Sequence, residues 1–571
     1  MNAGDHAPQM IQVAPAGGER VAAPPRLALW LRIALAAVIA AGLGLRVIWP
    51  GTTVFCNDQA MACALAEDIA AGRWQSAAVP SSAGFRSTPG YVYLLAAAWK
   101  THPSPMTLLY FITAANVAAV ALAFFLMRRW LGAAAAWWAT ALLASTPWAI
   151  HYSRWIWNQD LLFPTALLAY WFLWRWLQGR RWAALGLVLA VALVTQIHLS
   201  GLALGIAVLL YWLWARPKVP FWPVAIGVVI AVVSFLPYLL GGHLGVPSEG
   251  RMGYRHFWRT FAGAAMSVTG LHWGLEFKDG YPAFVEGLQW RHWAYQVVLS
   301  LPLALLAGGV GMGLVRLWRQ RRAGLEARRS PLSMIAALAI LVLVAFVLTG
   351  FRTSPTYLPL WYPLPFALMG WAAVSLMRRP DGVSSWRGRP ALASRGHPAL
   401  ADPHVPNGEA AAARSGPVAP PSRPGAWRNW LAAVLLAVMA GQLAFFAEQL
   451  NYMRVRGGVP GSVIERSYAG ATADVTAAVG QVHTREVYLD YEGRSNIQDA
   501  AAAWLFRHAK WSGDQPGRTL IRFAWGQGQS APAVTATLLP DDVPPDANYF
   551  QVRPWTGPQE RGGGILYRPA P

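Results

Sequence analysis

The sequence predicts an all-α polytopic membrane protein of about eleven transmembrane helices, with a small C-terminal α/β domain outside the membrane. The 571 residues are 55% hydrophobic and only 13% charged, whereas soluble proteins carry about a quarter charged residues. Apolar runs of membrane-spanning length recur along the chain. The 31 tryptophans are typical of membrane–water interfaces, where the ring is buried and its N–H stays wet.

A helix needs about 20 mostly apolar residues to cross the hydrocarbon core. The candidate spans are 27–49, 105–127, 133–150, 159–177, 182–197, 199–215, 220–241, 294–317, 332–350, 357–377 and 428–447. The apolar run 89–100 is too short, and we expect an interfacial or re-entrant helix there. Residues 1–26 are rich in Pro, Gly and Ala, which predicts a disordered N-terminus, with 27–49 as an uncleaved first span.

The basic residues predict the orientation. They gather in alternate connections, at 128–129, 175–181, 216–218, 316–329 and 378–379. By the positive-inside rule these connections are cytoplasmic, as is the N-terminus. The loops 50–88, 151–158, 243–293 and 351–356 are then periplasmic, and the membrane is the inner (plasma) membrane. The formal net charge of +21 is explained by the cytoplasmic loops, and nucleic acid is not an expected partner.

Two regions depart from the membrane pattern. Residues 380–427 are rich in Pro, Ala, Ser, Gly and Arg, which predicts a flexible cytoplasmic linker between a transmembrane domain at 27–379 and the last span at 428–447. Residues 450–571 contain strand-like runs at Glu486–Tyr491 and Thr519–Phe523, with a helix predicted from Ile497 to His508 between them. This alternation predicts a periplasmic α/β domain.

Several function classes are disfavoured. Cys56 and Cys63 lie about 10 Å apart if one helix holds both, too far for a disulfide. The sequence has no phosphate-binding loop of the Gly-x-x-x-x-Gly-Lys-Ser/Thr type and no dinucleotide fingerprint, so an ATP-driven pump is not expected. The histidines of 243–293 lack metal-ligand spacing, and no metal is predicted. His198 is interpreted as a structural residue.

Two carboxylates lie at predicted outer ends of spans. Asp58 follows the first span by a few residues, where a carboxylate suits a general base acting on a lipid-borne substrate. A helix N-cap is the alternative. Asp160 begins an otherwise apolar span, and an ionisable residue there usually faces a cavity or a partner. Arg154 is the nearest candidate partner, and a structural Arg–Asp pair or a helix cap is the alternative.

Basic and aromatic residues on the same predicted face suit a phosphate. Arg86 precedes the short aromatic helix that contains Tyr91, and a guanidinium pairs well with phosphate oxygens. A snorkelling surface arginine is the alternative. Arg352 and Tyr357 stand before the tenth span, where both could contact a lipid phosphate. A loop arginine beside an aromatic-belt residue is the alternative.

The order of these features resembles the GT-C superfamily of membrane glycosyltransferases. They are an acid after the first span, a Pro- and Tyr-containing short helix, an Arg…Asp segment before the fourth span, and an arginine and a tyrosine before a late span. The nearest likeness is to the branch of protein O-mannosyltransferases and aminoarabinose lipid A transferases, over roughly residues 27–377. It implies inverting transfer of a hexosyl or pentosyl group from a polyprenyl-phosphate sugar to an envelope protein, lipid or glycan at the periplasmic face.

The resemblance also implies roles for individual residues. Asp58 corresponds to the catalytic acid of the first loop and Asp160 to the second acid. Arg86 and Tyr357 stand where phosphate contacts are expected, and Tyr91, Arg154 and Arg352 join them as predicted substrate contacts. Many members have Asp-Glu where this chain has Asp58-Gln59. Phe85 precedes Arg86 where some members place a metal-binding acid, so a divalent metal stays an open alternative that the sequence does not support. The polyprenyl-phosphate sugar is implied as the donor substrate.

Two other functions fit a polytopic chain. A transporter or flippase of a lipid-linked saccharide would favour polar residues near span centres and inverted repeats, but no clear repeat is evident and the polar residues cluster at outer ends. A non-catalytic scaffold that displays the C-terminal domain is the other alternative.

Overall fold

The computed structural model describes most of the predicted spans and part of the C-terminal region. The described residues are 27–80, 86–216, 220–243, 254–270, 284, 287–321, 328–349, 355–377, 426–456, 467–482, 484–491, 501, 504–505, 509, 515–524, 533–539 and 550–552. The predicted disordered segment 1–26, nearly all of the predicted linker 380–427, and Arg352 lie outside these residues.

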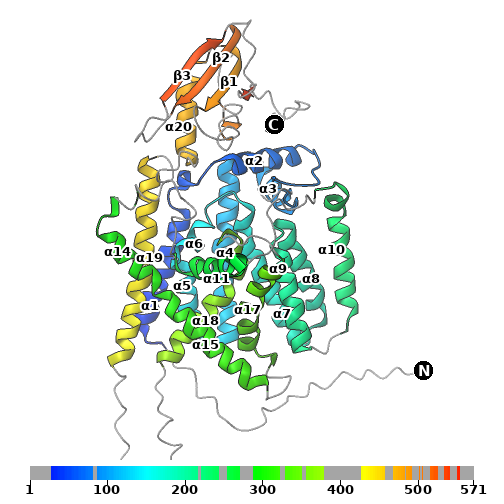
Figure 1. Ribbon diagram of the computed structural model, residues 1–571, viewed down its shortest axis with the longest axis vertical. Coiled ribbons are helices and arrows are strands. Elements are labelled where there is room, and N and C mark those ends of the chain that lie inside the picture. The colour runs from blue at the N-terminus through cyan, green and yellow to red at the C-terminus, as the bar shows by residue number, and fades with distance from the viewer. Residues whose placement is uncertain are drawn as a thin grey trace, which may run out of the picture.

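Every predicted span contains a helix. The helices are α1 (Leu29–Val47), α4 (Pro105–Leu131), α5 (Ala133–Ser145) with α6 (Pro147–His151), α7 (Leu162–Leu177), α8 (Arg181–Ile197), α9 (Gly201–Ala215), α10 (Trp222–Leu240), α14 (Arg291–Ser300) with α15 (Pro302–Arg321), α17 (Pro331–Thr349), α18 (Pro363–Met377) and α19 (Ala426–Arg456). They stand side by side as a bundle (Figure 1). A further helix, α11 (Tyr254–Thr269), packs against α6, α15 and α17.

The chain is a multi-pass membrane protein. Among the described residues, six helices are long and apolar enough to cross a membrane, namely α1, α4, α10, α14 with α15, α17 and α19. The other predicted spans correspond to α5, α7, α8, α9 and α18, which have 13 to 17 residues each. The polytopic helical architecture is therefore confirmed, and the number of eleven spans stays a prediction.

Small residues set the close approach of the central helices. A Cβ on Gly42 of α1 would lie 2.2 Å from the backbone oxygen of Ala144 in α5. A Cβ on Gly370 of α18 would lie 2.5 Å from the backbone oxygen of Ala135, also in α5. Helix association inside a membrane depends on such contacts, since lipid provides no hydrophobic drive between helices. The glycines thus let α1 and α18 pack directly on α5.

Two helices lie across one end of the bundle, α2 (Asn57–Ala70) and α3 (Gly90–Trp99) (Figure 1). A capping box begins α2, since the amide of Cys56 donates to Oε1 of Gln59 at 3.1 Å. At 10 residues, α3 rises only about 15 Å and is too short to span, as predicted. Gly90 brings it against α8, where a Cβ would lie 2.7 Å from the backbone oxygen of Gln196.

The C-terminal region contains α20 (Tyr468–Val479) and a four-stranded sheet of order β3-β2-β1-β4. Its strands are β1 (Thr484–Tyr491), β2 (Gln515–Ala524), β3 (Ala533–Leu539) and β4 (Phe550–Val552). β1 and β2 are parallel and the other pairs antiparallel. The two predicted strands fall within β1 and β2. A parallel pair needs a crossover connection, and the predicted helix 497–508 lies in it, of which residues 501, 504 and 505 are described, all helical.

Candidate functional site

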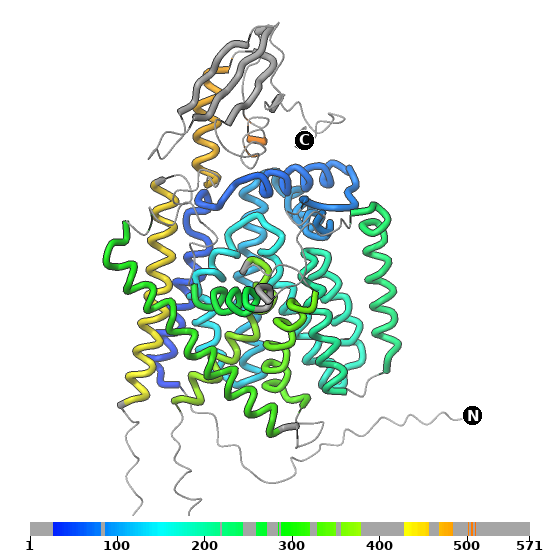
Figure 2. The backbone as a smooth tube through the Cα atoms, in the orientation of Figure 1, coloured from blue at the N-terminus to red at the C-terminus, as the bar shows by residue number. Residues whose placement is uncertain are grey.

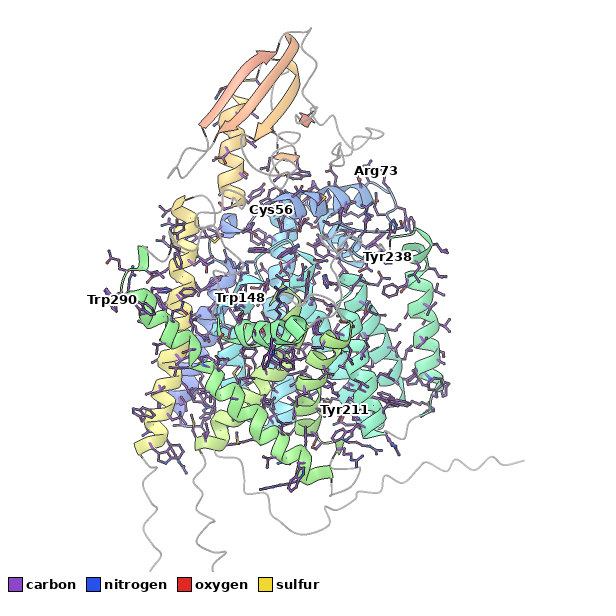
Figure 3. All side chains as sticks on the ribbon, in the orientation of Figure 1. Cys56, Arg73, Trp148, Tyr211, Tyr238 and Trp290 are labelled. Carbon is purple, nitrogen blue, oxygen red and sulfur yellow. The ribbon has the colours of Figure 1, made fainter. Side chains whose placement is uncertain are left out.

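Residues from three segments meet at the end of the bundle that carries α2 and α3, here called the α2–α3 end. Figure 3 places Cys56 and Arg73, which bracket α2, at this end together with Tyr238 of α10. The third segment is 152–161, which links α6 to α7 and finishes in a 3₁₀ turn, η2 (Asn158–Leu161). Apart from half-buried Trp157, every residue of that segment is buried.

Asp58 lies in the first turn of α2, and its carboxylate is partly shielded from solvent. Its Oδ2 accepts a hydrogen bond of 3.2 Å from Nε1 of Trp157. Burial raises the pKa of Asp58, and the hydrogen bond from Trp157 acts in the opposite direction. A carboxylate whose pKa is moved toward neutrality is a stronger general base at physiological pH.

Asp160 is fully buried, with 0% exposure. Neither carboxyl oxygen has a hydrogen-bond partner among the described residues, although the backbone amides of Trp155 and Trp157 lie near enough to act on its charge. Its backbone oxygen accepts a hydrogen bond of 2.8 Å from Nδ2 of Asn116, which fixes η2 against α4. Burying a carboxyl group without partners is costly, and groups kept in this state are candidates for function.

Tyr91 connects the two acids. The side chain is 2% exposed, and its hydroxyl has no hydrogen-bond partner among the described residues. Burial raises the pKa of Tyr91 well above its ordinary value, and the charges of Asp160 and Asp58 raise it further. The structure therefore brings Asp58 of α2, Tyr91 of α3 and Asp160 of η2 within electrostatic reach of one another.

Arg154 has a structural environment. Its guanidinium donates to the backbone oxygens of Leu45 and Trp49 and to Oγ1 of Thr52, at the end of α1 where unpaired carbonyls carry partial negative charge. The ion pairs between described residues do not include Arg154 with Asp160. The expected partnership of Arg154 with Asp160 is therefore not formed, because the donors of Arg154 are directed to the end of α1. A substrate contact by Arg154 stays a prediction.

Arg46 is a buried cation that the sequence reading missed. The residue is 3% exposed, and its Nη1 donates to the backbone oxygens of Gly42 at 2.8 Å and Ala144 at 2.9 Å. A single arginine changes the mean hydropathy of the first span little, because its neighbours are apolar. An ionisable residue inside a span is nevertheless a signal for a buried, partnered side chain, and Arg46 carried that signal in the sequence.

Arg86 is held by its backbone and presents its side chain to solvent. Its backbone oxygen accepts a 2.6 Å hydrogen bond from the hydroxyl of Tyr238, and its Nε donates to the backbone oxygen of Ala78 at 3.1 Å. The residue is exposed. Arg86 is thus fixed at the α2–α3 end with a cationic group accessible from outside the protein.

Tyr357 lies in η3 (Pro355–Trp361), which contacts η2. Its ring stacks on half-buried His198, with 4.7 Å between centroids. The backbone N–H of Ser200 donates to Nδ1 of His198 at 3.1 Å, so the proton of the neutral imidazole is on Nε2. Burial lowers the pKa of His198 to about 4. His198 is thus a neutral donor beside Tyr357, a role that a lone histidine in a sequence does not reveal.

The described residues contain no group of three or more His, Cys, Asp or Glu side chains placed to hold a metal ion. The predicted site residues fall into three groups by their position in the structure. Asp58, Tyr91 and Asp160 come together. Tyr357 lies in η3, which contacts η2, and Arg86 is exposed at the α2–α3 end. Arg154 binds the backbone at the end of α1.

Comparison with known proteins identifies the fold. No protein-family model matches the sequence, and no curated protein matches it. ArnT from Cupriavidus metallidurans, solved with undecaprenyl phosphate bound, superposes with a TM-score of 0.50 and 14% identity over 89% of this chain and 98% of ArnT. The Archaeoglobus fulgidus oligosaccharyltransferase AglB, in complex with an inhibitory peptide and a dolichol-phosphate, gives 0.39 and 14% over 86% and 61%. The arabinosyltransferase EmbB from Mycobacterium smegmatis gives 0.35 and 16% over 63% and 32%.

The likeness to ArnT shows a shared fold, and it extends over nearly the full length of both chains. The expected resemblance is thereby confirmed at the level of the fold alone.

Proposed function

We propose that this chain, which shares the fold of ArnT, is an inverting glycosyltransferase of the GT-C superfamily. It transfers a hexosyl or pentosyl group from a polyprenyl-phosphate sugar to a hydroxyl of an envelope protein, lipid or glycan. The observation that carries the proposal is the meeting of Asp58, Tyr91 and Asp160 at the α2–α3 end, where a fully buried carboxyl and a buried hydroxyl lack partners among the described residues. Buried polar groups in this state are suited to a substrate that completes their hydrogen bonds.

In the proposed reaction Asp58 is the general base. It takes the proton of the acceptor hydroxyl, whose oxygen attacks the anomeric carbon of the sugar. The bond from that carbon to the phosphate oxygen breaks, and its electron pair leaves with the polyprenyl phosphate, so the configuration at the anomeric carbon inverts. Trp157 donates a hydrogen bond to the carboxylate and favours its ionised form. Asp160 and Tyr91 bind and orient the acceptor.

Positive and neutral donors stabilise the departing phosphate. Arg86 offers an exposed guanidinium at the α2–α3 end, and Tyr357 with His198 offers donors beside η2. Arg352, predicted as a further contact, lies in the sequence five residues before Tyr357. Donors aimed at developing negative charge are usually the largest catalytic contribution in such sites. Because phosphate leaves readily as an anion, one base and a group of donors suffice.

The proposed location is the inner membrane, with the N-terminus cytoplasmic and the C-terminal α/β domain, 450–571, periplasmic. Figure 1 supports this arrangement, since the C-terminal sheet and α2 with α3 lie beyond the same end of the bundle, and α1 begins at the other end. The positive-inside rule assigns that other end to the cytoplasm. The donor and acceptor would then meet at the periplasmic face, where a lipid-linked sugar brings its own activation.

The test is sugar transfer by purified protein from a radiolabelled polyprenyl-phosphate sugar to envelope extract. Asp58→Asn should lower the rate by about 10²- to 10⁴-fold, the usual contribution of a general base, with unchanged thermal stability. Asp68→Asn is the matched control, because this carboxylate on the same helix pairs with half-buried Arg73. Full activity of Asp58→Asn would refute the assignment. The assay measures bond formation, so movement of lipid alone gives no signal.

A further inference from the structure

The C-terminal region is joined by its backbone to the segment that leads into α2. Val54 and Ser467 form an antiparallel β-bridge, and the amide of Tyr468 donates to the backbone oxygen of Thr53 at 2.8 Å. Val54, Thr53 and Ser467 are all buried, at 0%, 1% and 1% exposure. This contact links residues more than 400 positions apart, and it ends four residues before Asp58.

Aromatic side chains surround the bridge. The ring of Phe55, at 0% exposure, meets Tyr468 edge-on at 5.2 Å between centroids and Trp504 at 5.7 Å. Trp504 also meets Trp99 at 6.2 Å. We call Phe55, Trp99, Tyr468 and Trp504 the aromatic junction. Aromatic pairs at these distances stabilise a contact beyond the burial of their surfaces.

The aromatic junction touches the elements that carry the candidate site. Phe55 directly precedes Cys56, the N-cap of α2, so its position fixes where the first turn of the helix, which carries Asp58, begins. Trp99 ends α3, the helix that carries Tyr91. The bridged residue Thr53 also donates through Oγ1 to the backbone oxygen of Arg154 at 2.6 Å, three residues before Trp157.

We propose that Tyr468 and Trp504 are positioning residues, through which the C-terminal region holds the start of α2 so that Asp58 meets its substrate in the productive geometry. The inference rests on the proposed function, because transfer is its readout. Neither residue belongs to the Asp58, Tyr91 and Asp160 group, and both act through Phe55. Misplacement of a catalytic group by about 1 Å costs about a hundredfold in rate, so a modest shift of Phe55 suffices to change turnover.

Substitutions at Tyr468 separate its ring from its backbone donor. Tyr468 is the first residue of α20, after the N-cap Ser467, whose Oγ accepts from the amide of Gly470 at 3.1 Å. Proline is well tolerated at this helix position. Tyr468→Pro therefore removes the N–H that bonds to Thr53 and also the ring, Tyr468→Ala removes only the ring, and Tyr468→Phe keeps both.

The experiment measures kcat and KM for the lipid donor in full-length purified protein. We expect Tyr468→Phe to match the wild type, Tyr468→Ala to lower kcat about tenfold, and Tyr468→Pro to lower it about a hundredfold. KM for the donor should stay within about twofold, because the proposed phosphate contacts lie on other segments. Trp504→Ala should lower kcat in the same way, and Trp504→Phe should restore most of it. Thr476→Ala, on the exposed face of α20, is the control.

Thermal unfolding of each variant is measured in the same detergent. A fall in kcat counts only for a variant that unfolds cooperatively near the wild-type temperature. Wild-type kcat in both Tyr468→Pro and Trp504→Ala overturns the inference and leaves the proposed function standing. A rise in KM at constant kcat also overturns it, since it assigns the junction to donor binding. Absence of transfer by the wild type overturns the proposed function, and this inference with it.

Discussion

The hydrogen bond from Trp157 to Asp58 gives a prediction about pH. Trp157→Phe removes the Nε1–H that lies 3.2 Å from Oδ2 of Asp58 and retains a ring to face Trp155, whose centroid is 5.4 Å away. Burial raises the pKa of Asp58 and this hydrogen bond lowers it, so its loss raises the pKa further. Only the ionised carboxylate can accept the proton of the acceptor. The acid limb of the pH–activity profile should therefore move to higher pH.

The size of the effect follows from the geometry. A hydrogen bond to a charged group contributes about 1.5–3 kcal/mol, and 3.2 Å is at the long limit for N–H···O bonds, which favours about 1.5 kcal/mol. Since about 1.4 kcal/mol is a factor of ten, kcat/KM on the acid limb should fall about tenfold. At pH values above the limb, where Asp58 is ionised in both proteins, the variant should approach the wild type.

The assay is the pH dependence of kcat/KM for transfer by purified wild type and variant in one buffer series of constant ionic strength. Trp74→Phe is the matched control, because Trp74 is 65% exposed and has no contact with Asp58. An acid limb at the same pH in wild type and Trp157→Phe would refute the reasoning. A uniform loss at every pH would also count against it, because that result indicates displacement of the base without a change in its pKa.

Three further predictions concern stability and donor binding. Tyr91→Phe removes a buried hydroxyl that has no partner among the described residues. It should raise the free energy of unfolding by about 1 kcal/mol and lower the rate of transfer. Equal transfer rates in wild type and variant would exclude a substrate contact by the hydroxyl. Gly42→Ala places a methyl 2.2 Å from a backbone oxygen of α5 and should cost about 1–3 kcal/mol in chemical denaturation, whereas Gly44→Ala meets nothing within 4 Å and should be neutral or stabilising. His198→Ala should raise KM for the lipid donor about tenfold, and His198→Gln, which keeps an N–H donor, should restore it; equal KM values in the two variants would contradict a donor role.

Much of the architecture is dictated by local composition, and for this reason it could be predicted. A run of about 20 apolar residues is stable across a bilayer almost regardless of its neighbours, so helices occur at every predicted span. The same reasoning separated α3 from the spans by its length. Alternating strand-like runs located β1 and β2 within a few residues. The number of membrane crossings depends on how the shorter helices are enclosed by others, which composition does not determine.

The candidate site could be predicted only as a set of residues. Their order along the chain pointed to Asp58 and Asp160, and the structure brings these two together with Tyr91. The contact between Trp157 and Asp58 joins residues 99 positions apart, and no local pattern reports such a contact. Arg154 shows the same limit, because its local sequence gives no sign that the carbonyls ending α1 occupy its donors.

The contacts of α19 have a consequence for the integrity of the chain. Nε2 and Oε1 of Gln442 lie in the bundle interior, where Oε1 accepts from Ser145 at 2.9 Å. Glu448 accepts from Arg291 and from the hydroxyl of Tyr295, both at 2.7 Å. Figure 2 shows α19 running alongside α1 for most of its length, and the two helices are in contact.

These contacts hold α19 against the bundle between residues that the structure describes, and residues 378–425 join α18 to α19 in the sequence. Packing therefore holds the last helix in place, and a peptide connection adds to it by keeping the two parts at high local concentration. Co-expressed as separate polypeptides, 1–379 and 424–571 should co-purify and carry out transfer together. A natural split of the coding sequence at this point would accordingly be tolerated.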